Sequence, residues 1–258
     1  MDIFQSIIIG VIEGITEFLP ISSTAHMVLA AKVMNIAQTD FVKSFEIVIQ
    51  FGAILSVAAL YWKRFLLDFE SLKRVLAAFI PTAIVGFVLY KIIKTVLLGS
   101  TSVIVWALFI GGALIILFEL IHKEKASAHE DISTIPYSKC VGIGLFQSLA
   151  VVPGISRSAA TIIGGLTLGL KRTTIVEFSF LLAVPTMLAA SVLDLAKSGS
   201  TITSDQFGIL AVGFVVSFIV AMLSIKFLLG FVKKHSFVPF GVYRMIAALL
   251  FAAYMLFR

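Results

Sequence analysis

Charged residues are scarce in this 258-residue sequence. Asp, Glu, Lys and Arg together make up 13% of it, where a soluble domain carries about 25%, and hydrophobic residues make up 60%. The shortage of charge excludes an ordinary soluble domain and indicates an integral membrane protein. No polar stretch is long enough for a separate soluble unit, so we expect a single membrane domain over residues 1–258.

Cysteine is nearly absent as well, and Cys140 alone excludes an intrachain disulfide. The first residues carry no basic cluster and no small-residue cleavage pattern follows, so we expect no cleaved signal peptide. The net charge of +6 comes mostly from short loops between apolar stretches. There it predicts topology and contact with lipid head groups, and we expect no nucleic-acid partner.

Long apolar runs dominate what remains. Six of them are long enough to cross a bilayer as helices, which takes about 20 residues. They lie near residues 46–62, 75–93, 102–121, 176–196, 207–229 and 239–257. The first is short, and an extension upstream by a turn stays open. The sequence therefore predicts an all-α integral membrane protein with six transmembrane helices.

Two further apolar regions are each broken by a proline, Pro20 in the first and Pro153 in the second. The paired pieces are residues 3–19 with 23–34 and residues 138–152 with 156–169. Proline lacks an N–H and clashes with the preceding turn, so a helix stops there. Each piece is short for a full crossing, and we expect two re-entrant helical hairpins.

The order of hairpin, three spans, hairpin and three spans predicts an internal repeat with halves of approximately 1–122 and 138–258. Three spans is an odd number, so the second half must insert upside down relative to the first. Inverted repeats of this kind place the site near the midplane, where the broken helices meet.

Loop charge predicts the orientation. We count twelve Lys and Arg residues in loops on the side opposite the termini and six on the side of the termini. The richer side is cytoplasmic by the positive-inside rule. We therefore expect the termini and the first hairpin to face outward, and the second hairpin to enter from the cytoplasm.

The first hairpin carries acidic and nucleophilic groups. Glu13 and Glu17 share one helix face, and a divalent cation such as Mg²⁺ or Ca²⁺ would relieve their repulsion. The alternative is a pair bonded to hydroxyls, or one carboxyl held protonated. Ser23 and His26 are three residues apart, so His26 can exchange a proton with the hydroxyl or with a leaving group. The competing interpretations are capping by Ser22 or Ser23 and a core histidine.

The second hairpin supplies a cation. Arg157 opens a helix between Ser156 and Ser158, where free N–H groups favour an anion and a guanidinium can clamp phosphate. Thr161, one turn on, can add a hydroxyl. The alternative is a structural arginine paired with Glu13 or Glu17. Together the two hairpins predict a phosphate site. Its catalytic candidates are Glu17, Ser23, His26 and Arg157, and its substrate-binding candidates are Ser22, Thr24, Ser156, Ser158 and Thr161.

Other polar residues in the apolar segments are expected to be structural. Glu46 and Glu177 would cap or orient spans, and Arg244 would snorkel outward or pair with a Glu. Gly10 and Gly14 would permit close helix contact.

The segments EGITEFLPISSTAH at 13–26 and PGISRSAAT at 153–161 closely resemble the two signature motifs of the BacA/UppP family of undecaprenyl-diphosphate phosphatases, the bacitracin-resistance proteins. The likeness extends over essentially the whole chain, including FSFLLAVP at 178–185. It implies hydrolysis of undecaprenyl diphosphate to undecaprenyl phosphate and inorganic phosphate, which recycles the lipid carrier for peptidoglycan synthesis. It also implies a divalent cation and an extracytoplasmic site in the bacterial plasma membrane. The family roles fall on Glu13, Glu17, Ser23, His26, Ser156, Arg157 and Thr161.

Two other functions compete. Inverted repeats with broken helices are common in transporters, so a polyprenyl-phosphate transporter or flippase is the main alternative. The type-2 phosphatidic-acid phosphatase fold fits poorly, because its Lys-rich first motif and its second His-containing motif are absent. Covalent attack by Ser23 and direct attack by a cation-bound water both remain open, and so does the oligomeric state, including a homodimer.

Overall fold

The computed structural model describes residues 1–92, 100–124, 128–198 and 206–256, and throughout these ranges its regular structure is helical. Within these ranges, six helices are long and apolar enough to cross a membrane. They are α3 (Asp40–Leu60), α5 (Phe69–Ile92), α6 (Thr101–Ile121), α9 (Arg172–Ser198), α10 (Phe207–Val232) and α11 (Val238–Leu256). The predicted all-α fold with six spans is confirmed.

Helix α3 begins at Asp40, so the span predicted near residues 46–62 does extend upstream, by six residues instead of a single turn. The Thr39 side chain accepts a hydrogen bond from the N–H of Val42 and so caps a helix that starts at Asp40. Hydropathy alone does not indicate this first turn, because it contains the polar residues Asp40 and Lys43. A short helix, α4 (Trp62–Leu67), then leads into α5.

The outer faces of the long helices are apolar. Phe87, Leu114 and Leu223 are 72%, 54% and 61% exposed, respectively. Such a surface would be unfavourable in water, and it fits contact with lipid acyl chains.

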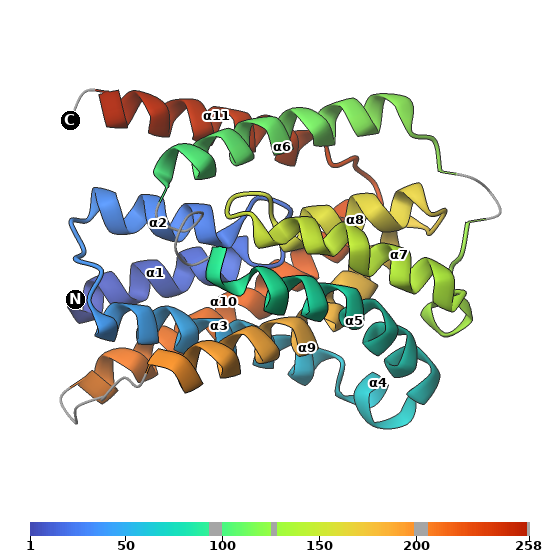
Figure 1. Ribbon diagram of the computed structural model, residues 1–258, viewed down its shortest axis with the longest axis horizontal. Helices are drawn as coiled ribbons and strands as arrows, with labels where there is room; N and C mark the ends of the chain where they lie inside the picture. The colour runs from blue at the N-terminus through green and yellow to red at the C-terminus, as the bar shows by residue number, and fades with distance from the viewer. Residues whose placement is uncertain (93–99, 125–127, 199–205, 257–258) are drawn as a thin grey trace.

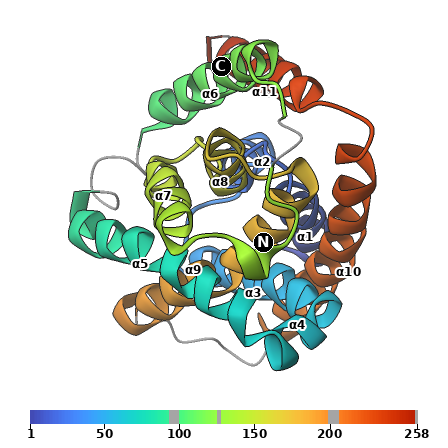
Figure 2. The same ribbon diagram turned by 90° about the vertical axis from the view of Figure 1, so that its right-hand side faces the viewer.

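Two helical hairpins occupy the middle of the molecule. The first is formed by α1 (Ile3–Thr16) and α2 (Ser23–Val33). The second is formed by α7 (Tyr137–Ser148), the 3₁₀ turn η3 (Leu149–Val151) and α8 (Arg157–Thr167). In Figure 1 they approach from opposite ends of the long axis, and Figure 2 shows the long helices arranged around them. Helix α1 packs on α10, as α7 packs on α5. This correspondence is what an inverted repeat predicts, and re-entrant insertion stays a prediction.

Glycines allow both hairpins to approach their neighbours. A methyl group at Gly10 would lie 2.9 Å from the carbonyl oxygen of Gly213, and one at Gly14 would lie 2.9 Å from the backbone nitrogen of Ala221. The expected close contact is confirmed. In the second hairpin a methyl group at Gly144 would lie only 2.0 Å from the carbonyl oxygen of Ala78 on α5.

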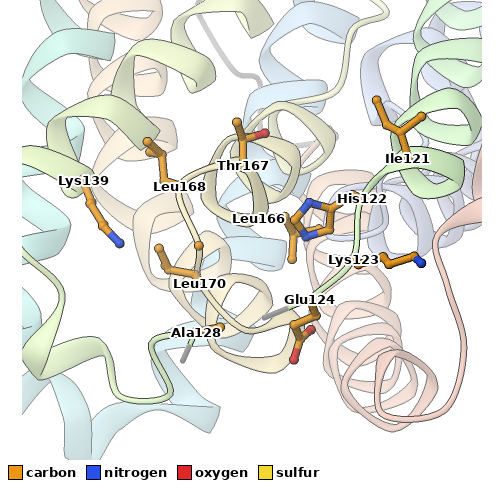
Figure 3. Close-up of a pocket in the computed structure, with 11 residues that line it drawn as sticks. Ile121, His122, Lys123, Glu124, Ala128, Lys139, Leu166, Thr167, Leu168 and Leu170 are labelled. Carbon is orange, nitrogen blue, oxygen red and sulfur yellow. The ribbon is translucent and has the colours of Figure 1, made fainter. Parts of the chain in front are cut away.

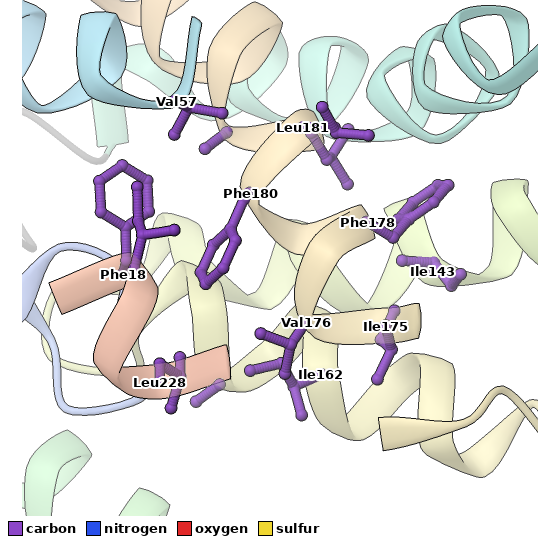
Figure 4. Close-up of a cluster of buried hydrophobic side chains, with 14 of the residues drawn as sticks. Phe18, Val57, Ile143, Ile162, Ile175, Val176, Phe178, Phe180, Leu181 and Leu228 are labelled. Atoms are coloured by element: carbon purple, nitrogen blue, oxygen red, sulfur yellow. The ribbon is translucent and has the colours of Figure 1, made fainter. Parts of the chain in front are cut away.

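The largest hydrophobic cluster joins both hairpins to α9 (Figure 4). Phe18, in the first hairpin turn, meets Phe180 of α9 edge to face, with ring centroids 5.5 Å apart. Ile162 of α8 and Leu228 of α10 belong to the same cluster. The turn of the first hairpin is therefore held in a hydrophobic core to which both halves of the chain contribute.

Ion pairs hold together the end of the molecule opposite the termini. Arg172 forms a two-fold ion pair with Glu119, which also accepts from the Phe237 N–H at 3.0 Å. Glu177, which was expected to cap or orient its span, lies within α9 and pairs with Arg64 at 3.3 Å. Of the basic residues counted for orientation, Lys94, Lys125 and Arg258 lie outside the described residues.

Candidate functional site

The two hairpin turns share an unusual backbone conformation. Ser22 has φ 74° and Ser156 has φ 79°, in the left-handed half of the map where only glycine is comfortable. Each such residue costs roughly 1–3 kcal/mol, so the surrounding structure must enforce it. Both serines immediately precede the second helix of their hairpin. Of the capping interpretations, Ser156 fits, because its hydroxyl accepts from the Ala159 N–H at 3.2 Å, whereas Ser22 makes no side-chain cap.

Glu17 lies at the junction of the two hairpins. Its Oε2 accepts a hydrogen bond from Ser23 Oγ at 2.5 Å, and its Oε1 accepts from Arg157 Nη2 at 2.9 Å. Glu17 and Ser23 are both buried, and the Arg157 side chain is 12% exposed. A buried carboxylate paired with an arginine and a hydroxyl forms strong, charge-assisted hydrogen bonds. The structure thus joins a hydroxyl, a carboxylate and a guanidinium.

The Arg157 guanidinium is fixed by more than its carboxylate. Nη1 donates to the Ser179 carbonyl oxygen at 2.8 Å, and the group lies 5.8 Å from the Phe18 ring centroid. Within the described residues the buried Nε has no partner. Arg157 therefore retains a free donor for an anion while its other nitrogens hold it in place.

Glu13 is fully buried, and neither of its carboxylate oxygens has a partner among the described residues. An unpaired carboxylate at this depth requires a proton or a cation. The described residues hold no cluster of three or more His, Cys, Asp or Glu side chains. Mg²⁺ commonly uses one or two carboxylates together with substrate phosphates, so Glu13 and Glu17 fit such an ion.

His26 is not directed at Ser23, contrary to expectation. Its Nδ1 lies 2.8 Å from the Ser22 carbonyl oxygen, and its Nε2 lies 2.8 Å from the Tyr243 hydroxyl. The spacing of three residues does put both side chains on the first turn of α2. However, the Ser23 hydroxyl donates a hydrogen bond to the buried Glu17, and the His26 imidazole bonds the hydroxyl of Tyr243 from α11.

The remaining predicted hydroxyls differ in their surroundings. Ser158 Oγ donates to the Phe18 carbonyl at 2.8 Å and so ties the hairpins together. Thr161 Oγ1 lies 2.8 Å from the Arg157 carbonyl and 3.2 Å from Gln147 Oε1. Thr24 is partly exposed. The structure brings Ser158 and Thr161 next to the site with partners inside the protein, and contact with substrate stays a prediction for all three.

Arg244 neither snorkels nor pairs with a glutamate, so that expectation was wrong. Its side chain is fully buried and donates to five backbone carbonyls. The acceptors are Leu108 at 3.3 Å, Pro20 at 3.2 Å, Ile155 at 2.8 Å, Ala107 at 3.1 Å and Gly154 at 2.9 Å. The reason is that both broken turns leave carbonyls without helical partners, and a guanidinium has five N–H donors. Arg244 thereby fastens both hairpin turns to α6.

Sequence reasoning also missed Tyr243, Ser179 and Gln147. Tyr243 precedes the intramembrane Arg244, and this position was the signal available. Ser179 lies in the 178–185 stretch that carries part of the family likeness. Gln147 donates to Thr82 Oγ1 at 2.9 Å and to Thr186 Oγ1 at 3.1 Å, which fixes the end of α7 beside the site.

A cavity of about 580 Å³ lies elsewhere, between the ends of α6 and α8 (Figure 3). It is lined by Ile121, His122, Lys123, Glu124, Ala128, Lys139, Leu166, Thr167, Leu168, Gly169 and Leu170. None of the candidate site residues borders it, so it does not form part of the site described here.

The sequence matches the family described as bacitracin resistance protein BacA over residues 6–250. It is 50% identical over 254 residues to the undecaprenyl-diphosphatase of Aquifex aeolicus, covering 98% of this chain and 99% of that protein. It is 52% identical over 251 residues to the undecaprenyl-diphosphatase of a Sulfurihydrogenibium species, covering 97% and 98%. It is 48% identical over 256 residues to that of Persephonella marina, covering 99% and 100%. Likeness of this extent, on a fold of six long apolar helices, shows that the chain belongs to the bacitracin resistance protein BacA family.

Proposed function

We propose that this protein hydrolyses undecaprenyl diphosphate to undecaprenyl phosphate and inorganic phosphate, which recycles the lipid carrier for peptidoglycan synthesis and gives bacitracin resistance. The observation that carries the proposal is the buried contact of Ser23 and Arg157 with the two oxygens of Glu17. The undecaprenyl-diphosphatase names of the relatives support the same activity.

Arg157 and the N-terminus of α8 would bind the diphosphate. A guanidinium can hold two phosphate oxygens at once, and the free N–H groups of a helix N-terminus favour an anion. Their positive charge also stabilises the charge that develops during phosphoryl transfer. A Mg²⁺ or Ca²⁺ ion, held by Glu13 and Glu17, would neutralise further phosphate charge when bound.

Ser23 Oγ attacks the terminal phosphorus in this mechanism. Its proton passes to Glu17 Oε2, which already accepts the hydrogen bond, and the bond between the terminal phosphorus and the bridging oxygen breaks. Undecaprenyl phosphate leaves, and water then cleaves the phosphoseryl bond to release inorganic phosphate. Because Glu17 takes the Ser23 proton, His26 would serve as the base toward the attacking water, once its Nε2 exchanges the Tyr243 hydroxyl for that water.

In the alternative mechanism a water attacks the phosphorus directly. Quenching the reaction during turnover and mapping phosphate by mass spectrometry separates the two mechanisms. We expect phosphate on Ser23 in the wild-type protein and a loss of at least about 100-fold in turnover for Ser23→Ala, within the range of general acid–base and nucleophilic effects. Near-normal turnover in Ser23→Ala would show that Ser23 is not the nucleophile.

We place the protein in the bacterial plasma membrane, with both hairpins re-entrant and the site open to the extracytoplasmic side. Six apolar helices and the family support the membrane assignment. The charge of the loops supports the orientation. The homodimer stays a prediction, and light scattering of the purified protein in detergent tests it.

Phosphate release by the purified protein in detergent is the decisive experiment, because no membrane has to be crossed there. We expect release that stops with a chelator and returns with Mg²⁺ or Ca²⁺. No release under any cation condition, with flux of polyprenyl phosphate across reconstituted vesicles, would favour the transporter or flippase instead.

A further inference from the structure

We propose that Tyr243 is a positioning residue of the phosphatase site, which holds Nε2 of His26 and so fixes the orientation of its ring. The proposal rests on the proposed function for its catalytic consequence, and on geometry alone for the contact. Tyr243 comes from the last helix, α11, and lies far from both sequence motifs.

The hydrogen bonds of His26 determine its tautomer. A carbonyl oxygen can only accept, so the 2.8 Å contact with Ser22 requires the proton to be on Nδ1. In the neutral imidazole Nε2 is then the acceptor, and it lies 2.8 Å from the Tyr243 hydroxyl, which donates. The two rings are within 8° of parallel, with centroids 5.5 Å apart. Both nitrogens and the ring plane are therefore fixed.

The contact is not forced by burial of the tyrosine. Tyr243 is 45% exposed, so its hydroxyl could be satisfied by solvent or lipid head groups without a protein partner. A buried hydroxyl would need a protein partner in any case. The Tyr243 hydroxyl does not, and it still bonds one nitrogen of His26.

The residue that follows Tyr243 anchors this part of α11 to both hairpin turns. The next residue, Arg244, donates to Pro20 at 3.2 Å and to Ile155 at 2.8 Å. Pro20 lies just before Ser22, whose carbonyl holds the other nitrogen of His26. One turn of α11 thus sets the distance between the tyrosine hydroxyl and the turn that carries the histidine. Catalytic groups need such support, because small misplacements lower the rate.

The test is a double-mutant cycle on kcat for phosphate release from the lipid diphosphate by the full-length protein in detergent. Tyr243→Phe keeps the aromatic ring and removes the hydroxyl. From the net strength of one hydrogen bond we expect kcat to fall about three- to tenfold, with KM within about twofold of wild type. In the His26→Ala background the same change should have no further effect.

Tyr137→Phe is the matched control, because Tyr137 is 46% exposed and sits at the start of α7. It should retain the wild-type kcat. Wild-type kcat in Tyr243→Phe, or an equal fall with and without His26, would overturn the proposal.

A second measurement does not depend on turnover. In ¹⁵N-histidine NMR spectra, with His26→Ala used for assignment, Tyr243→Phe should shift the ring nitrogen signals of His26 and leave those of His122, His129 and His235 in place. Unchanged His26 signals would overturn the proposal even if the His26→Ala background were too slow for kinetics. Shifted signals together with a wild-type protein that releases no phosphate would instead remove the proposed function and leave the contact standing.

Discussion

At the scale of single residues, the site depends on side chains that use more than one of their polar atoms. Glu17 accepts through both carboxylate oxygens, from Ser23 and from Arg157. Arg157 bonds Glu17 and Ser179 and keeps Nε free. Both side chains are therefore held in place, and the proposed phosphoryl transfer needs preorganised groups of this kind.

The first prediction concerns the planar guanidinium of Arg157, which bonds both Glu17 and Ser179. Arg157→Lys keeps the positive charge but replaces the planar group that spans Glu17 and Ser179 with a single ammonium. We expect phosphate release to fall at least about tenfold in Arg157→Lys and about 100-fold or more in Arg157→Ala, by loss of one transition-state donor group. Lys43→Ala, which removes an exposed ion pair with Asp40, should leave turnover unchanged. Wild-type turnover in Arg157→Lys would show that charge alone suffices.

Arg244 carries the second prediction, and here the expected effect is on stability. Removing its guanidinium leaves carbonyls of both hairpin turns without donors, at about 1–3 kcal/mol for each buried group left unpaired. Arg244→Ala should therefore lower the Tm in detergent by several degrees or more. Lys226→Ala, at an exposed position of α10, should leave the Tm within about one degree, as surface changes usually do. An unchanged Tm in Arg244→Ala would mean that the five contacts are replaced by water.

At the scale of elements, the hairpins depend on close backbone contact with the long helices. Gly144 of α7 packs against Ala78 of α5, in the place that Gly10 of α1 takes against Gly213 of α10. Small residues at such contacts let helices approach in a membrane, where the hydrophobic effect does not drive association. The turns between the hairpin helices can then meet in the middle of the molecule.

Gly144→Ala and Gly86→Ala form a matched pair. Both glycines are in helices, but a methyl group at Gly144 would overlap the Ala78 carbonyl, whereas one at Gly86 of α5 would have nothing within 4 Å. We expect Gly144→Ala to lose about 1–3 kcal/mol of stability by overpacking. Gly86→Ala should be neutral or stabilising by up to about 1 kcal/mol, from helix propensity. Thermal unfolding in detergent compares them, and equal Tm values would contradict the tight contact.

At the scale of the whole molecule, the orientation that we propose from the loop charges can be tested directly. Cys140 is the sole cysteine and is buried, so Cys140→Ala provides a background for cysteines placed at will. Lys43 lies at the end of the molecule that holds the termini, and Lys234 lies at the opposite end, so each is changed to cysteine in turn. An impermeant maleimide applied to intact spheroplasts should label Lys43→Cys and leave Lys234→Cys unlabelled until the membrane is opened. The reverse labelling pattern would mean that the site faces the cytoplasm.

By itself the sequence determined the class of fold, the six spans and the two broken regions, because hydropathy and proline act on the local backbone. It also identified Glu13, Glu17, Ser23, His26 and Arg157 as candidates, since ionisable groups are rare in apolar helices. The upstream extension of α3 was underestimated, because its polar first turn is capped by Thr39 and is not marked by hydropathy.

Only the tertiary structure decided which of these groups meet. Arg157 and Glu17 are 140 residues apart, and His26 and Tyr243 are 217 apart, so no local spacing relates them. The assignment of the Ser23 hydroxyl to Glu17, of His26 to Tyr243 and of Arg244 to the carbonyls of the turns followed from packing. The physical reason is that a buried polar group takes whichever partner the fold brings within hydrogen-bonding distance, and that partner depends on how the two hairpins and α11 come together.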